Sequence, residues 1–576
     1  MKQLDKISLF IILLGLFSII LENVSKLTPA GIFTSHLIDL LVSTLFIATF
    51  TFELFRAKRK IKYIKKNIVE FLFIVCFLVV IVCAKSYYFF IQPFYGHNIS
   101  TKFILVVCLF NAFKVLLRMR KLSKYLRNLT THPAQTIVVS FALVILVGTI
   151  FLMMSFSSVN GEEIGFVNSL FTATSATCVT GLVVLDTAKD FSPIGKSIIM
   201  ILMQIGGLGI MILASFAAFL VGKKMSLEEK LTMSYMLNED DTRNLARGIK
   251  NIVLLTLLLE GIGALMMMLV FKPSEFGFMR SVFYSAFHAV SAFCNAGFAL
   301  FSDNLVQYRS SGIINFTVAG LIIAGGISFV VIMDSYGYFR SRLLKLFKKA
   351  TRIEKFKLNT KIVILFTSIL IIVGTLLIYR FEHKGNLLSL DLKTQYLEAF
   401  FQSVTLRTAG FNTMDIGSLH KATYVVMILF MFIGGASGSI AGGIKVNTLG
   451  VLWASLRAVF NGKEEVVIFD QSLSKGLVNQ AYIITFLSLG VVFAGTLVLS
   501  LCEQQKFLDI IFETVSAFGT VGLSTGITPH LSIPGKLTLV LTMFIGRVGM
   551  ITLVTAFART RKHFDIRYPE GRVLIG

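Results

Sequence analysis

Four glycines recur along this chain in the same local frame. Gly181, Gly297, Gly410 and Gly522 are separated by 116, 113 and 112 residues. Ten residues before them stand Phe171, Phe287, Phe400 and Phe512. Six residues before them stand Ser175, Ser291 and Ser516, with Val404 in the third copy. Self-similarity at a nearly constant period indicates repeated structural units. The chain is therefore expected to contain four copies of one unit, each centred on its glycine.

The composition indicates that these units lie in a membrane. The 576 residues are 55% hydrophobic and 15% charged, with a mean hydropathy of +0.79, which exceeds what a soluble core needs. The net charge is +24. Its basic residues concentrate in short loops between apolar segments, so positive-inside orientation explains them better than nucleic-acid binding does. The six cysteines show no CxxC spacing, so neither disulfides nor a zinc site is expected. We find no convergent nucleophile, metal or phosphate motif in the sequence, so an enzyme is not expected.

Twelve segments are long and apolar enough to cross a bilayer. Four precede the repeats, at about 7–22, 33–55, 67–90 and 102–118, and each repeat has two. Between these two lies a segment of about ten residues that ends at the glycine and is too short to cross. Basic clusters mark the cytoplasmic side of the membrane, so both termini are expected there. The clusters lie at 56–66, 118–127, 340–361, 457–463 and 559–572.

The predicted fold is an all-α polytopic membrane protein with two regions. Residues 1–132 form a four-helix transmembrane region. Residues 133–576 form four helix, pore-loop, helix repeats around one pore, followed by a short cytoplasmic tail. The repeats cover about 133–222, 247–340, 360–458 and 476–560.

The short segments are predicted to form a cation filter. Irregular backbone at membrane depth is tolerated only where it is buried in protein or lines water, so the four segments must meet. The tripeptides before the glycines differ in side chain, while the glycine permits φ > 0 and lets backbone carbonyls face one axis. The helix dipoles of the preceding segments also favour a cation. Four kinks in a structural bundle are the alternative. The predicted filter residues are Cys178, Val179, Thr180, Gly181, Cys294, Asn295, Ala296, Gly297, Arg407, Thr408, Ala409, Gly410, Gly519, Thr520, Val521 and Gly522.

At this point the chain resembles the Trk/Ktr/HKT superfamily of cation transporters. The stretches TCVTGL, FCNAGF, LRTAGF and GTVGLS resemble its four filter stretches, and the ending RYPEGRVLIG resembles the C-terminus of a KtrB-type subunit. The resemblance covers about residues 133–576. It implies a homodimer with one pore per protomer and a cytoplasmic ring of nucleotide-binding regulatory subunits of the TrkA/KtrA type. In the plant branch, serine at the first filter glycine accompanies sodium selectivity. Glycine at position 181 therefore favours potassium, and sodium coupling stays open.

A second glycine element follows each filter 24 to 28 residues later. It is a glycine pair in three repeats, but Gly546-Arg547 in the fourth. An arginine within an apolar helix is a functional candidate by default. In the third repeat the stretch 434–444 holds five glycines in eleven residues, which predicts an intramembrane loop. The resemblance implies that this loop is the gate and that Arg547 contacts it; small-residue helix packing is the alternative. The predicted gate residues are Gly434, Gly435, Ala436, Ser437, Gly438, Ser439, Gly442, Gly443, Lys445 and Arg547.

Acidic residues follow the first three filters. Asp186, Asp303 and Asp415 stand five or six residues after their glycines. They are predicted to ring the outer mouth and to raise the local cation concentration. Solvated loop carboxylates without a role are the alternative.

The N-terminal region carries basic residues at every third position: Arg118, Lys121, Lys124 and Arg127. Because they mostly follow the apolar run, a juxtamembrane helix that meets anionic membrane lipid is the predicted meaning. A voltage sensor is the alternative, with Asp39, Glu53 and Glu70 as countercharges.

The predicted function is potassium uptake across the cytoplasmic membrane, as the channel-like translocating subunit of a Trk/Ktr system. No covalent cofactor is expected, and potassium at the filter is the only metal ion. A sodium-coupled or proton-coupled symporter is the alternative. A proton-coupled mechanism needs an acid that cycles its proton, for which Glu260 and Asp334 are the candidates in the pore unit's helices.

Overall fold

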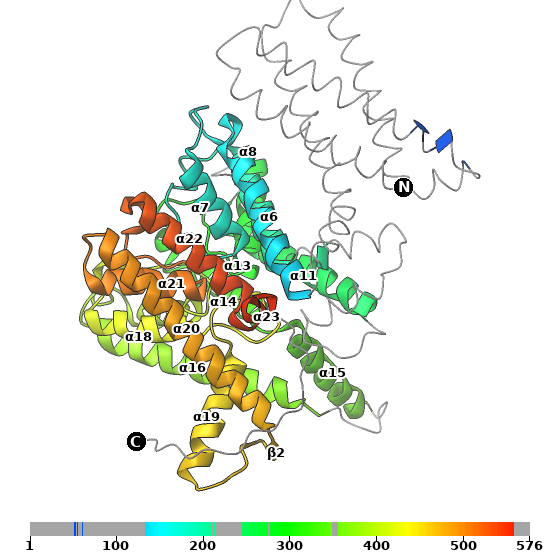
Figure 1. Ribbon diagram of the computed structural model, residues 1–576. Coiled ribbons are helices and arrows are strands. Elements are labelled where there is room, and N and C mark those ends of the chain that lie inside the picture. Colours follow the sequence, from blue (N-terminus) through cyan, green and yellow to red (C-terminus); the bar gives the residue numbers. More distant parts are fainter. Residues whose placement is uncertain are drawn as a thin grey trace, which may run out of the picture.

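The computed structural model describes residues 133–209, 212–213, 245–272, 274, 277–347 and 355–557, with a few positions between 51 and 60. The described chain is predominantly α-helical (Figure 1), which confirms the prediction of an all-α protein. The predicted N-terminal helices, the basic residues 118–127 and the tail after 557 lie outside the described residues, apart from those few positions. The boundary at 132 and 133 stays a prediction.

The helices occur in chain order as a long helix, a short helix and a second apolar helix, four times over. The long helices are α6 (Pro133–Met153), α11 (Leu245–Met268), α16 (Leu358–Glu382) and α20 (Lys475–Cys502). The short helices are α7 (Phe166–Thr177), α13 (Phe278–Phe293), α17 (Leu392–Thr405) and α21 (Phe507–Gly519). The second helices are α8 (Pro193–Leu208), α14 (Gly312–Gly326), α18 (Lys421–Phe432) and α22 (Ile533–Val548).

Three further helices and a small hairpin complete the described chain. The helices are α15 (Phe329–Leu346), α19 (Val446–Phe460) and α23 (Met550–Phe557). Strand β1 (Val467–Ile468) pairs antiparallel with β2 (Gln471–Ser472), with Val467 opposite Ser472. Single 3-10 turns lie at Ser155–Ser157, Val306–Tyr308, Ile416–Ser418 and Thr528–His530.

Within the described residues, four helices are long and apolar enough to cross a membrane: α6, α11, α16 and α20. Two bent pairs raise this number to six if each pair is one span, namely α14 with α15 at 104° and α22 with α23 at 92°. The sequence predicted a second spanning helix in each repeat, with an intramembrane loop in the third. A continuous second helix was wrong for the second and fourth repeats, where the two helices of each pair are bent against each other. Gly549 breaks the fourth with φ of 86°, and Gly209 ends α8 with φ of 80°. Such left-handed glycines terminate helices.

The second helices begin at side-chain caps. In three of them a serine hydroxyl accepts the N–H three residues further on, which satisfies a backbone donor that the helix leaves free. The caps are Ser192, Ser311 and Ser532, with donors Gly195, Ile314 and Gly535. These caps fix where each chain segment turns back from the short helix.

The four units close into a ring. Each short helix packs against helices of its own unit and also against the second helix of the unit before it in the ring: α13 on α8, α17 on α14, α21 on α18, and α7 on α22. The last contact joins the fourth unit to the first, and Figure 1 shows the red α22 beside α7. The C-terminal ends of the four short helices are buried. The closed ring therefore brings the segments that follow them together at its centre.

Candidate functional site

The four glycines of the repeat face one another. A Cβ placed on Gly181 would lie 2.5 Å from the carbonyl oxygen of Ala296, in the next unit. The same construction at Gly297 meets the Ala409 oxygen at 2.7 Å, and at Gly410 the Val521 oxygen at 2.6 Å. At Gly522 it meets the Thr180 oxygen, which closes the circle. We call this arrangement the glycine ring. Only a residue without a side chain fits at any of its four positions.

Residues of left-handed and right-handed backbone conformation alternate along the ring. The glycines have positive φ, from 69° to 95°. The residue two before each glycine is also left-handed: Val179, Asn295, Thr408 and Thr520, with φ from 50° to 66°. A non-glycine residue there costs about 1–3 kcal/mol, and such strain clusters at functional sites. The sequence predicted only the glycine positions, because the four strained residues share no side-chain type.

All sixteen predicted filter residues are buried. The serines six residues before the glycines support the ring directly. Ser175 accepts the N–H of Gly181 at 3.0 Å, and Ser516 accepts that of Gly522 at 3.1 Å. Ser291 instead donates to the carbonyl of Phe298 at 2.8 Å. The hydroxyls of Ser175 and Ser516 therefore hold the ring glycines themselves, and that of Ser291 holds the residue after its glycine.

The third unit is shifted by one residue relative to the sequence alignment. In the other three units the residue before the glycine donates its N–H to the serine carbonyl, but Ala409 donates to Thr405 rather than to Val404. Correspondingly Phe401 is fully buried like Phe171, whereas Phe400 is only partly buried, and its ring centroid lies 6.0 Å from that of Phe316. The alignment of Phe400 and Val404 with the other repeats was therefore wrong. Thr405 stands in the place of the serine.

A glycine-rich loop lies directly beside the ring. The loop, residues 434–444, leaves α18 and returns to α19, with Gly434 donating to Ile444 at 2.8 Å. A Cβ on Gly443 would meet the Cα of Gly519 at 3.2 Å, and one on Gly442 would meet the Thr520 side chain. On its other side the loop donates to α14, from Ala436 to Gly326 at 2.9 Å and from Ile440 to Gly325 at 3.3 Å. The loop therefore contacts both the fourth and the second units.

Three basic side chains lie around this loop. Arg407 donates to the carbonyl of Gly434 at 3.2 Å, and Lys445 donates to that of Ala441. Arg547 donates to the carbonyl of Gly206 in α8, and it lies within electrostatic range of Lys445. The hydrogen bond of Arg547 thus goes to the first unit. The role of the Arg407 side chain was missed, although one charged tripeptide among four was a signal.

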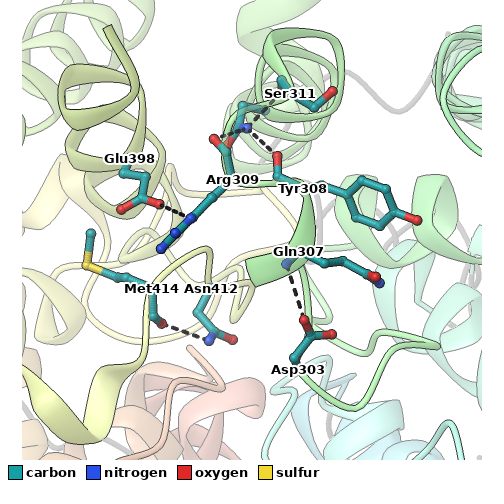
Figure 2. Close-up of polar contacts among 9 residues, drawn as sticks. Asp303, Gln307, Tyr308, Arg309, Ser311, Glu398, Asn412 and Met414 are labelled. Carbon is teal, nitrogen blue, oxygen red and sulfur yellow. Dashed lines mark hydrogen bonds and ion pairs between the residues drawn. The ribbon is translucent and has the colours of Figure 1, made fainter. Parts of the chain in front are cut away.

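The carboxylates predicted at the outer mouth cap their own turns. Asp186 accepts the N–H of Ala188 at 2.8 Å, and Asp415 accepts that of Gly417 at 3.0 Å. Asp303 accepts the N–H of Gln307 at 3.2 Å (Figure 2). These bonds give each carboxylate a structural role, so an electrostatic ring stays a prediction.

A contact between units two and three was not predicted. Figure 2 shows Arg309, after the second glycine, reaching Glu398 on α17, with 4.0 Å between Nε and Oε1. Beside it the Asn412 side chain donates to the Met414 carbonyl at 3.0 Å, and the backbone carbonyl of Asn412 accepts the N–H of Leu305 at 3.1 Å. These contacts tie the segment after the second glycine to the third unit.

The two candidate proton acceptors differ in their surroundings. Glu260 is buried and lies within α11, eight residues before its end. It accepts from Gln204 at 3.1 Å, and the thiol of Cys294 lies 4.0 Å from its Oε1. Asp334 accepts the backbone N–H of Lys357, which is not a predicted filter residue. Glu260 is therefore the acid in contact with a predicted filter residue.

Residues 96–565 match the family described as TrkH, cation transport protein. The chain belongs to this family. It is 39% identical over 446 residues to the Ktr system potassium uptake protein B of Bacillus subtilis, covering 77% of this chain and 97% of that protein. It is 36% identical over 451 residues to the potassium/sodium uptake protein NtpJ of Enterococcus hirae, covering 77% and 97%.

A solved structure has the same fold. The potassium transporter TrkH from Vibrio parahaemolyticus matches with a TM-score of 0.60 at 18% identity, over 97% of this chain and 99% of that chain. Together with the apolar helices, the family shows that this TrkH-family chain is a multi-pass membrane protein.

Proposed function

We propose that this chain is the translocating subunit of a potassium uptake system and that potassium passes through the glycine ring. The observation that carries the proposal is the closed ring of four glycines with alternating backbone hand. Successive residues of opposite hand point their N–H groups to one side, and therefore their carbonyls to the other. Carbonyl oxygens held in this way replace the hydration shell of a potassium ion.

The names of the relatives support this function. They are called potassium uptake proteins, and one is called a potassium/sodium uptake protein. All are named for uptake or transport, which supports transport rather than catalysis. The proposal includes four concatenated units around one pore, a cytoplasmic-membrane location and cytoplasmic termini. A homodimer and a cytoplasmic nucleotide-binding ring of regulatory subunits complete it.

The loop 434–444 is proposed as the gate of this pathway. It contacts the ring at Gly519 and Thr520 and is anchored to α14 by two backbone hydrogen bonds. Arg407 and Lys445 bond to its carbonyls, so positive charge lies beside the route of a cation. Conduction then requires that the loop move away from the ring.

The test is transport by the purified chain in proteoliposomes. Reversal potentials under opposed potassium and sodium gradients should show potassium preference, and Gly181→Ser should reduce it. A parent protein that passes neither ion, with or without its regulatory partner, would refute the function. A Gly181→Ser variant with the parent's selectivity would refute the assignment of the ring.

A proton-coupled symporter is the second candidate because Glu260 is buried and contacts Cys294 of the predicted filter. Coupling predicts that a potassium gradient drives proton flux and that Glu260→Gln abolishes this flux. The channel-like function predicts no such flux in the parent.

A further inference from the structure

Two buried side chains hold the backbone just beyond the glycine ring. His288 of α13 and Glu513 of α21 each stand nine residues before a ring glycine, and both are fully buried. His288 Nε2 accepts the N–H of Leu300 at 3.2 Å, and Glu513 Oε1 accepts that of Thr525 at 3.1 Å. In both units the donor is the third residue after the glycine. An imidazole in the second unit and a carboxylate in the fourth therefore make the same bond to the backbone.

Glu513 holds its segment with more than one bond. Ser524 donates to Oε1 at 2.5 Å, and Thr528 donates to Oε2 at 2.9 Å. The Ser524 hydroxyl in turn accepts the N–H of Gly526 at 2.9 Å. A carboxylate is an acceptor with two oxygens, which suits a site that presents only donors. The segment that leaves the fourth glycine is therefore fixed to its short helix at several points.

His288 is held in one orientation. Its Nδ1 lies 2.8 Å from the carbonyl of Tyr284, so Nδ1 carries the proton and Nε2 is the acceptor. The ring stacks on Phe301 at 5.1 Å and lies 5.5 Å from Phe271. These contacts prevent the imidazole from rotating away from Leu300.

The corresponding residues of the other two units make no such bond. Thr172 donates to Asn168 of its own helix at 2.9 Å. Gln402 takes this place in the third unit, once its one-residue shift is counted. Its amide atoms have no hydrogen-bond partner among the described residues. We call the two side chains His288 and Glu513, with their bonds to the backbone, the clamp. The clamped units are the second and the fourth, which lie opposite each other because the four units follow one another around the ring in chain order.

We propose that His288 and Glu513 are positioning residues for ion selectivity, which together set the width of the glycine ring along the diagonal through units two and four. This inference rests on the proposed function of the ring. In the cavity-size account of selectivity, carbonyls discriminate potassium from the smaller sodium ion because the backbone resists closing around sodium. The clamp supplies that resistance from outside the ring, where neither side chain contacts the ion.

The experiment compares variants by reversal potential under potassium and sodium gradients. Glu513→Leu removes the acceptor of the Thr525 N–H and of the Ser524 and Thr528 hydroxyls, which as donors keep only the bond between them. The potassium-to-sodium permeability ratio should therefore fall about tenfold. Glu513→Gln keeps one carbonyl oxygen for Thr525 and should retain most of the ratio. His288→Phe keeps the aromatic packing but loses one acceptor, so its loss should be smaller than that of Glu513→Leu.

Two matched controls separate positioning from folding. Glu382 is also a buried carboxylate, but it binds His420 and Thr423 at the start of α18, away from the ring. Glu382→Gln should lower the yield of folded protein and leave the permeability ratio unchanged. Thr172→Val changes the equivalent position of an unclamped unit and should also leave the ratio unchanged.

The outcomes decide between the two proposals. If Gly181→Ser changes the ratio while Glu513→Leu and His288→Phe do not, the clamp is wrong and the ring stands. If Glu382→Gln lowers the ratio as much as Glu513→Leu, the effect is general destabilisation and the clamp is wrong. If Gly181→Ser has no effect, the assignment of the ring itself fails. Should Glu513→Leu not fold, the ratio of His288→Phe decides the matter.

Discussion

Replacing the first ring glycine tests the site most directly. Gly181 has φ of 95°, so an alanine or serine there would cost about 1–2 kcal/mol in backbone conformation alone. Its Cβ would also lie 2.5 Å from the Ala296 oxygen, far inside contact distance. The obstacle is backbone of the neighbouring unit and cannot rotate away, so overpacking adds about 1–3 kcal/mol. The combined cost corresponds to at least about a thirtyfold change in an equilibrium constant.

This strain has to appear where the units meet, which is the proposed ion path. Gly181→Ala should therefore lower the apparent affinity for potassium and the potassium-to-sodium permeability ratio. Gly181→Ser should do the same and also place a hydroxyl near the ion, so it should admit more sodium than Gly181→Ala does. The assay is reversal potential and concentration dependence of uptake in proteoliposomes.

Gly161 provides the control for backbone strain. It also has positive φ, of 70°, but a Cβ there would have nothing within 4 Å. Gly161→Ala should therefore affect stability only through its own turn and leave selectivity unchanged. If Gly181→Ala transports like the parent, or if Gly161→Ala alters selectivity equally, the steric reasoning about the ring is wrong.

Three further predictions concern the rest of the chain. Deleting residues 436–442 removes the loop's bonds to α14 and should raise flux without a cytoplasmic partner; unchanged flux at normal expression counts against a gate. Arg309→Gln should change the free energy of unfolding by less than about 1 kcal/mol, because the Arg309 side chain is 44% exposed and its Nε lies 4.0 Å from Oε1 of Glu398, beyond hydrogen-bond distance; denaturant titration measures this. Each of the four basic residues Arg118, Lys121, Lys124 and Arg127 should contribute about 1 kcal/mol of attraction to anionic lipid. Neutralising all four should alter the lipid dependence of transport more than its voltage dependence. A loss of the voltage response would instead favour a voltage sensor.

The sequence predicted the ring glycines because only glycine satisfies both of their constraints, a left-handed backbone and a neighbouring carbonyl in the place of a Cβ. It did not predict the left-handed residues two positions earlier. Asn295 is of a type that adopts this conformation readily, but valine and threonine are not, so in the other three units the surrounding packing imposes it. The clamp was not predicted either, because a histidine and a glutamate accept the same hydrogen bond but are different residue types, so no repeat is visible in the sequence.

The third unit shows why an alignment by letters can fail by one residue. Phe400 and Phe401 are adjacent and identical, so the sequence alone gives no reason to choose between them. The hydrogen bond from Ala409 to Thr405 decides the frame, because it shortens the link between helix and glycine by one residue. The bends in the second and fourth repeats were missed for a related reason. A glycine in an apolar run is compatible with close helix packing and with a helix end, and only the backbone angles distinguish them.

The distribution of charge explains why the four units are not identical. A symmetric ring of backbone carbonyls needs no side-chain charge, and three of the four predicted filter tripeptides have none. The third and fourth units instead carry Arg407, Lys445 and Arg547, each donating to a backbone carbonyl. Three cations beside the proposed ion route would oppose the passage of a fourth, because like charges repel strongly where water is excluded. Their carbonyl partners lie on the loop and at the end of α8, so movement of the loop would displace at least Arg407 and Lys445 together. We infer that the backbone ring shared by the four units determines selectivity. Gating is then determined by the loop and the basic residues that occur only in the third and fourth units.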